Sequence, residues 1–139
     1  MDDLKNLCRI LKDAKTIAVV GISRNSGKTS RNIASFLVEK GYKVIGVNPS
    51  ANGEEFDGIK VYSSLEAINE KIDIVDVFRK SEDIPQLIPS VLKVNPKVLW
   101  LQQGIRNDEA VSPVKQKGIE VIQDSCIAVM YSLCSADLN

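Results

Sequence analysis

The stretch from Thr16 to Lys40 limits most strongly what this chain can fold into. A short apolar run of mainly β-branched residues, Thr16 to Val20, ends at Gly21. A polar loop with glycine, serine and two basic residues follows, and a helical pattern begins near Ser30. This order predicts a strand, a loop and the start of a helix. Free N–H groups at a helix start carry roughly +0.5 of a charge and favour an anion. We therefore expect a nucleotide or phosphate site here.

The rest of the chain alternates between strand and helix patterns. Further strands are predicted at residues 43–47, 59–62, 72–78, 97–102 and 119–122, and further helices at 64–70, 81–92, 107–117 and 125–133. This alternation predicts a Rossmann-like three-layer α/β/α sandwich with a mostly parallel sheet of five to six strands. We expect the strand order 3-2-1-4-5-6 rather than the flavodoxin-like order. Ligands of such sheets bind beyond the carboxyl ends of the strands.

Length and charge limit the classes of function. The 139 residues predict one domain, with a leading helix over 1–15, a nucleotide-binding core over 16–124, and a C-terminal helix and tail over 125–139. Eighteen basic and eighteen acidic residues cancel, so no global field favours nucleic acid or a membrane surface. Apolar runs fall short of the roughly 20 residues of a membrane helix. We expect a cytoplasmic protein with neither a nucleic-acid nor a membrane partner.

The inventory of reactive side chains is small. Cys8, Cys126 and Cys134 are too few and too scattered to predict a disulfide framework. The chain has no histidine, so we expect no structural metal. Without imidazole the commonest general base is also missing, and an enzyme of this sequence would have to work without it.

The glycine loop departs from two common phosphate-binding motifs. Gly27-Lys28-Thr29 looks like the end of a P-loop, but five residues separate Gly21 from Gly27, where that motif has four. The dinucleotide fingerprint G-x-G-x-x-G is absent, and the second strand ends without an acid for the ribose. A P-loop NTPase and a nicotinamide-dependent protein are both disfavoured.

Five short motifs occur in order along the chain. They are AVVGIS at 18–23, GVNP at 46–49, DIVDVFR at 73–79, LWLQQGIRN at 99–107 and DSC at 124–126. Together they resemble the stand-alone CoA-binding proteins, which are similar to the CoA-binding Rossmann domain of the succinyl-CoA synthetase α subunit. The resemblance covers roughly residues 15–127. It implies a CoA-binding fold whose first loop holds phosphate.

The resemblance also implies which residues contact the ligand. The diphosphate would be surrounded by Gly21, Ile22, Ser23 and Arg24, with Lys28 and Ser30 supplying a further charge and hydroxyl. The adenosine side would be lined by Asn48, Pro49 and Ser50, and the pantetheine arm would be bordered by Phe78, Arg79, Gln102, Gln103 and Gly104. CoA carries a diphosphate and a 3′-phosphate, so it needs cations and open N–H groups rather than a ribose-binding acid.

These expectations lead to a function. We expect non-covalent binding of coenzyme A or an acyl-CoA by a binding or regulatory module without catalysis of its own. Its partners besides this nucleotide ligand would be a second copy of the chain or an acyl-CoA enzyme. The alternatives are a small NAD(P)- or nucleotide-using enzyme, or a CoA transferase that uses Cys126.

Some residues have both a functional and a structural interpretation. Cys126 is either a reactive thiol near the ligand or a small apolar side chain, and the second is favoured. Lys28 either holds the 3′-phosphate or is a solvated cation. Asp73 and Asp76 face opposite sides of a strand, so they cannot form a catalytic pair, and we expect both to be solvated. Trp100 is expected in the core, and Asn107 is expected to cap the helix that follows it.

Overall fold

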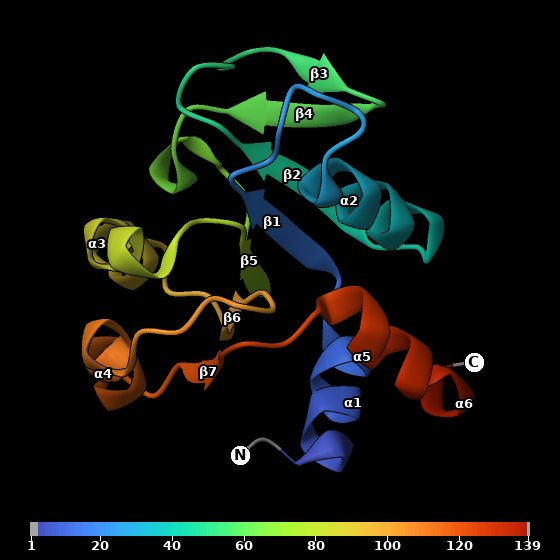
Figure 1. The fold of residues 1–139 in the computed structure, drawn as a ribbon, viewed down its shortest axis with the longest axis vertical. Helices are drawn as coiled ribbons and strands as arrows, with labels where there is room; N and C mark the ends of the chain where they lie inside the picture. The colour runs from blue at the N-terminus through green and yellow to red at the C-terminus, as the bar shows by residue number, and fades with distance from the viewer. Residues whose placement is uncertain (1–2, 139) are drawn as a thin grey trace.

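A seven-stranded sheet forms the centre of the molecule (Figure 1). The computed structural model describes residues 3–138, so expectations for residues 1, 2 and 139 lie outside the described residues. The strands are β1 (Thr16–Val20), β2 (Lys43–Val47), β3 (Glu55–Phe56), β4 (Ile59–Tyr62), β5 (Ile74–Val77), β6 (Val98–Leu101) and β7 (Glu120–Ile122). Their order is β3-β4-β2-β1-β5-β6-β7, and the ladder is parallel except between β3 and β4. The predicted order of the six parallel strands is confirmed.

The antiparallel strand β3 was not predicted, so the sheet has one strand more than expected. It contributes only two residues, which pair with Lys60 and Ile59 of β4. Asp57 and Gly58 connect the two strands with φ values of +51° and +83°. An Asp-Gly pair with positive φ at both positions is a favoured two-residue hairpin turn, so the sequence did contain a local indication of β3.

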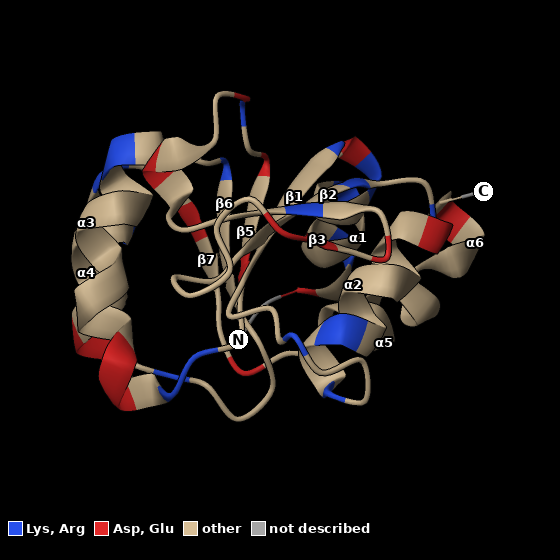
Figure 2. Ribbon diagram, turned by 90° about the horizontal axis from the view of Figure 1, so that it is seen from above, with Lys and Arg blue, Asp and Glu red and all other residues tan. Residues whose placement is uncertain are grey.

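Helices cover both faces of the sheet, as Figure 2 shows. One face carries α3 (Ile84–Val94) and α4 (Asp108–Gln116), and the other carries α1 (Leu4–Asp13), α2 (Thr29–Glu39), α5 (Ile127–Leu133) and α6 (Ser135–Leu138). The three-layer Rossmann-like architecture is thus confirmed. The helix expected at 64–70 is only a 3₁₀ turn, Leu65–Ala67, because Ile68 turns to extended backbone and is buried in the core.

Alternation along the strands divides the core between the two faces. On β1, Ile17 and Val19 face α1, α2 and α5, whereas Ala18 and Val20 face α3 and α4. Trp100 of β6 lies on the first of these faces and is fully buried, as expected. Its indole N–H donates to the carbonyl oxygen of Ser125 at 2.8 Å. Asn107 caps α4 as expected, because its side chain accepts from the N–H of Ala110 at 3.0 Å.

A disulfide joins Cys8 of α1 to Cys134, which lies between α5 and α6. The expectation that the cysteines form no disulfide framework is wrong for this pair. The two residues are 126 positions apart in sequence, but α1 and the C-terminal helices lie side by side on one face of the sheet (Figure 1). Cys126 is free and half-buried.

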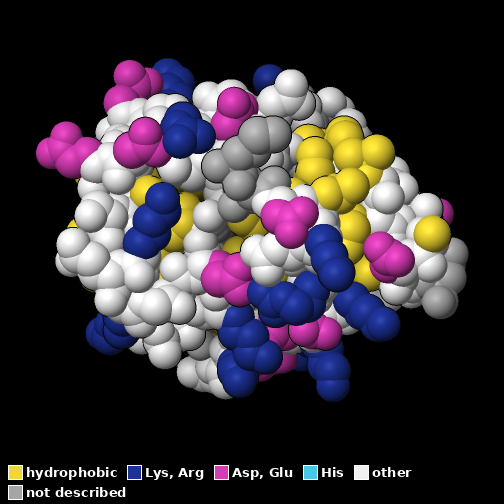
Figure 3. Space-filling model, turned by 90° about the horizontal axis from the view of Figure 1, so that it is seen from below, with side chains coloured by type: hydrophobic (Ala, Val, Ile, Leu, Met, Phe, Trp, Pro, Cys, Tyr) yellow, Lys and Arg dark blue, Asp and Glu magenta, His cyan; other side chains and the backbone are white. Residues whose placement is uncertain are grey.

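Charges of both signs mix on the surface, and one part of the face in Figure 3 gathers hydrophobic side chains. The exposed large hydrophobic residues include Leu4 of α1 and Val129 and Leu133 of α5. Within residues 3–138, no helix combines the length and apolar character needed to cross a membrane.

Candidate functional site

The loop after β1 lies at the carboxyl end of the sheet, between β2 and β5. Its first residue, Gly21, has a φ of +89°. A Cβ at this position would collide with the carbonyl oxygen of Phe78 and lie 3.1 Å from its carbonyl carbon. Only glycine lets the loop pass so close to the end of β5. This is the point where the strand order reverses, and ligands of such sheets bind there.

Most amide groups of this loop already have partners. The N–H of Ser23 donates to the hydroxyl oxygen of Ser30, and the N–H of Asn25 donates to that of Ser23, both at 3.0 Å. Within residues 3–138, the N–H groups of Arg24 and Ser26 have no hydrogen-bond partner. Within the same residues, the N–H groups of Ile22 in the loop and of Thr29 and Ser30 at the start of α2 also have no partner, so several amides remain open to a phosphate here.

Two predicted contact residues stabilise the loop with their side chains. Ile22 is fully buried and packs over Gly46 of β2, so only its backbone can face a ligand. Ser30 is also buried, and its hydroxyl is engaged by Ser23. Lys28 is exposed directly before α2 and forms no ion pair within residues 3–138.

The side chain of Arg31 of α2 holds the glycine loop in place. This side chain is 7% exposed and donates to the carbonyl oxygen of Arg24 at 2.8 Å and to the carboxylate of Asp57 at 2.5 Å. The guanidinium also lies 4.8 Å from the ring centre of Phe56. One buried cation thus joins α2, the loop and the β3–β4 hairpin. Sequence reasoning missed Arg31, because a single basic residue in a helix belongs to no motif.

The predicted adenosine-side residues follow β2 and lie against the same loop. The Asn48 side-chain amide donates to the carbonyl oxygen of Ile22 at 2.9 Å, and its oxygen accepts from the N–H of Ser50 at 2.9 Å. Arg24 donates to the carbonyl oxygen of Ser50. Pro49 is exposed between them. The structure therefore brings the loops after β1 and β2 together.

A cavity of about 560 Å³ opens on the other side of Gly21. It is formed by the segments that follow β5 and β6, by the first turns of α2 and by the residue before α5. Its lining residues are Thr29, Ile33, Phe78, Arg79, Lys80, Gln102, Gln103, Gly104, Ile105 and Cys126. All five residues predicted to border the pantetheine arm are among them.

Two hydrogen bonds hold the wall of this cavity, one buried and one exposed. The side-chain oxygen of Gln102 is buried and accepts from the N–H of Ile127, the first residue of α5, at 3.1 Å. The N–H of Gly104 donates to the carboxylate of Asp124 at 2.6 Å. Cys126 directly precedes Ile127, so Gln102 also fixes the segment that carries the free thiol.

Asp76 lies on β5, two residues before the cavity residue Phe78. It is fully buried between Val19 and Trp100 in the ladder, and neither carboxyl oxygen has a hydrogen-bond partner within residues 3–138. Burial raises the pKa of Asp76 well above its usual value. The expectation that Asp76 is solvated is wrong, because β5 is a central strand covered by helices on both faces.

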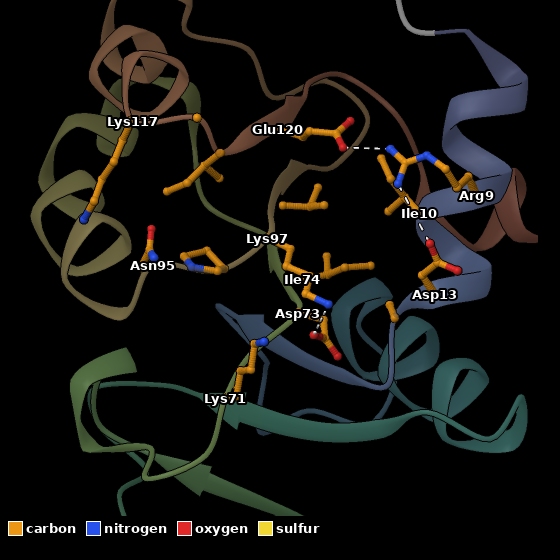
Figure 4. A pocket seen from close by; sticks show the side chains of 15 residues that line it. Arg9, Ile10, Asp13, Lys71, Asp73, Ile74, Asn95, Lys97, Lys117 and Glu120 are labelled. Atoms are coloured by element: carbon orange, nitrogen blue, oxygen red, sulfur yellow. Dashed lines mark hydrogen bonds and ion pairs between the residues drawn. The ribbon is translucent and has the colours of Figure 1, made fainter.

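A second cavity, of about 490 Å³, lies at the opposite end of the sheet (Figure 4). Its charges are largely paired: Arg9 contacts Glu120 at 2.8 Å, and Asp73 accepts from the backbone N–H of Thr16 at 3.0 Å. Asp73 is thus half-buried rather than solvated. The C-terminal ends of α3 and α4 border this cavity, and their carbonyl groups disfavour a bound anion. We therefore take the cavity at the carboxyl end as the candidate site.

Residues 15–132 match a protein family described as "CoA binding domain". This chain belongs to that family. The match spans the glycine loop, the loop after β2 and the whole wall of the larger cavity. The resemblance inferred from the five motifs is confirmed.

This CoA-binding domain has relatives of nearly its own length. It is 42% identical over 124 residues to the uncharacterized protein YneT of Bacillus subtilis (strain 168), covering 89% of this chain and 90% of that protein. The solved structure of cell-free ID.343 from Thermus thermophilus has a TM-score of 0.92 and 36% identity, covering 96% of this chain and 99% of that one.

Longer proteins contain the same domain. The α subunit of acetate–CoA ligase (ADP-forming) I of Pyrococcus furiosus is 24% identical over 136 residues, covering 88% of this chain but 29% of that subunit. The dinucleotide-forming acetyl-coenzyme A synthetase 1 of Ca. Korarchaeum cryptofilum, solved with phosphate and ADP, has a TM-score of 0.68 and 25% identity, covering 87% of this chain and 27% of that one. The CoA-binding domain thus spans less than a third of these enzymes.

Proposed function

We propose that this CoA-binding domain binds coenzyme A or an acyl-CoA non-covalently and acts as a binding or regulatory module without catalysis of its own. The observation that carries the proposal is the 560 Å³ cavity beside the glycine loop. It gathers apolar walls from Ile33, Phe78 and Ile105 with a few polar groups, chiefly Gln102 and Arg79. Such a lining suits a slender arm of methylenes and amides.

The nucleotide end of the ligand would lie on the other side of Gly21. There the open N–H groups of Arg24 and Ser26 and the start of α2 supply positive partial charge for phosphate oxygens. Asn48 and Ser50 present polar groups within reach of the same loop. The two regions together match the two ends of CoA.

The absence of catalysis is proposed from the larger relatives. In the Pyrococcus furiosus ligase subunit, the region that aligns with this domain is 29% of the subunit, and the rest of the subunit lies outside the alignment. We infer that the domain supplies CoA binding and that other parts of such enzymes supply the reaction. A module of this kind would act through an acyl-CoA enzyme or a second copy of itself.

A thermal-shift screen with CoA, acetyl-CoA, NAD, NADP, ATP and GTP tests the ligand class. A ligand that binds only the folded state raises the melting temperature. We expect a shift with the CoA compounds alone, followed by saturable binding in calorimetry. A shift with NAD or ATP alone would favour a nucleotide-using enzyme instead.

Matched charge variants test the position of the site. Arg79→Gln changes the proposed cavity, and Lys97→Gln changes the cavity at the opposite end of the sheet. We expect only Arg79→Gln to weaken CoA binding. Exchange of CoA between acetyl-CoA and a second carboxylic acid such as propionate, followed by chromatography of the two thioesters over many turnovers, tests catalysis. Exchange that is lost in Cys126→Ser would support a transferase that uses the free thiol and overturn the proposal.

A further inference from the structure

Arg24 of the glycine loop and Glu54 of the segment before β3 form an exposed ion pair. Their side chains are 51% and 44% exposed. The Arg24 guanidinium donates to Glu54 through both Nε and Nη2, and Nη2 also donates to the carbonyl oxygen of Ser50. One guanidinium is therefore held by a carboxylate and a carbonyl on the side of the loop that faces the β3–β4 hairpin.

The direction of the Arg24 side chain separates it from the cavity. Its partners Ser50 and Glu54 follow β2, whereas the cavity is lined by segments that follow β5 and β6. These groups lie on opposite sides of β1 in the sheet. The side chain of Arg24 thus points toward the proposed adenosine side, away from the proposed pantetheine side.

The contact itself indicates the class of ligand group. A guanidinium binds a carboxylate and a phosphate with the same planar fork of N–H donors. Glu54 is ionised in this contact, since the hydrogen bond from Arg24 lowers its pKa. An exposed ion pair contributes little to stability, so a dianionic phosphate can displace the carboxylate.

We propose that Arg24 binds the 3′-phosphate at the adenosine end of the ligand and that Glu54 competes with that phosphate for the same guanidinium. This inference rests on the proposed function and assigns one part of the ligand to one residue. It differs from the expectation that Arg24 contacts the diphosphate and Lys28 the 3′-phosphate. Within residues 3–138 the Lys28 side chain forms no hydrogen bond or ion pair with the hairpin, and the neighbouring cation Arg31 is buried and engaged by Asp57.

Calorimetry with CoA and with dephospho-CoA, which lacks the 3′-phosphate, tests the inference. We expect Arg24→Gln to weaken CoA about tenfold and to leave dephospho-CoA nearly unchanged. Glu54→Gln is expected to tighten CoA binding by about 1.4- to 5-fold, because the phosphate no longer has to break an exposed ion pair, which is weak. Glu55→Gln is the matched control, because it removes the same charge from the next residue, which forms no ion pair with Arg24.

The double variant Arg24→Gln/Glu54→Gln completes the design. If Glu54 acts through Arg24, the gain from Glu54→Gln disappears when Arg24 is absent. Equal weakening of CoA and dephospho-CoA by Arg24→Gln would place Arg24 on the diphosphate and overturn the inference while the proposed function stands. If Glu54→Gln and Glu55→Gln tighten CoA binding equally, Glu54 acts only through the net charge of the protein, and the proposed competition is overturned. Wild-type protein that binds neither nucleotide would instead reject the proposed function and the inference with it.

Discussion

Asp76 on β5 and Trp100 on β6 are direct partners in the parallel ladder, and both are fully buried. The indole N–H of Trp100 is satisfied by the carbonyl oxygen of Ser125, whereas neither oxygen of Asp76 has a partner within residues 3–138. An unpaired carboxylate in an apolar core is much less stable than the neutral acid. Burial therefore raises the pKa of Asp76 well above its usual value, which favours the protonated acid in the folded chain.

Asp76→Asn should remove a pH dependence of stability. The folded chain binds a proton that the unfolded chain releases above about pH 4, so wild-type stability falls as pH rises toward the folded pKa, by about 1.4 kcal/mol per pH unit. Asparagine does not titrate in this range. We expect the variant to be more stable than wild type at about pH 8 and the difference to shrink toward about pH 4. Urea unfolding at several pH values measures this.

Asp73 supplies the control with the opposite sign. Burial alone would raise the pKa of Asp73, but the backbone N–H groups of Thr16 and Lys15, with the charges of Lys97 and Lys71, lower it overall. A lowered pKa stabilises the folded chain above the unfolded pKa, and this stabilisation is lost as pH falls through the folded pKa. Asp73→Asn should therefore destabilise the protein at neutral pH. A shift of the same sign in both variants would contradict the assignment.

The contrast between these acids shows what sequence patterns can and cannot predict. Strand and helix alternation was sufficient for the parallel order, and the rule that ligands bind at the carboxyl ends of strands placed Phe78 and Gln102 on one wall. The burial of Asp76 depends on helices that cover both faces of β5. The pairing of Cys8 with Cys134 likewise depends on two helices that meet only in the folded chain.

Gly21→Ala should destabilise the protein more than a matched glycine variant. A methyl group at Gly21 would strain the backbone, because φ is positive, and would also collide with the backbone of Phe78. We expect the free energy of unfolding to fall by about 2–5 kcal/mol. Gly53 also has positive φ, +83°, but a Cβ there has no atom within 4 Å. Gly53→Ala should therefore cost only about 1–2 kcal/mol. Urea unfolding compares the two, and equal losses would show that the Phe78 contact is unimportant.

Arg31→Gln should weaken both the fold and the loop. The variant loses charged hydrogen bonds to the carbonyl oxygen of Arg24 and to Asp57, and we expect a loss of about 2–3 kcal/mol. Arg9→Gln is the control, because Arg9 pairs with Glu120 at an exposed site and should cost no more than about 1 kcal/mol. CoA affinity should fall in Arg31→Gln and stay unchanged in Arg9→Gln. Similar losses of stability in the two variants would mean that the buried contacts of Arg31 stabilise the fold no more than an exposed ion pair does.

Acetyl-CoA should protect Cys126 from alkylation. Cys8 and Cys134 form the disulfide, so Cys126 is the free thiol among the three cysteines, and it lies in the wall of the cavity. Without reductant, the native protein should take up a single iodoacetamide, and Cys126→Ser should take up none.

Saturating acetyl-CoA should slow the labelling of Cys126, because the pantetheine arm would cover the thiol. Acetyl-CoA is preferred to CoA, whose own thiol would consume the reagent. Intact-mass spectrometry follows the reaction, and an unchanged labelling rate at a concentration that raises the melting temperature would exclude this cavity as the pantetheine site.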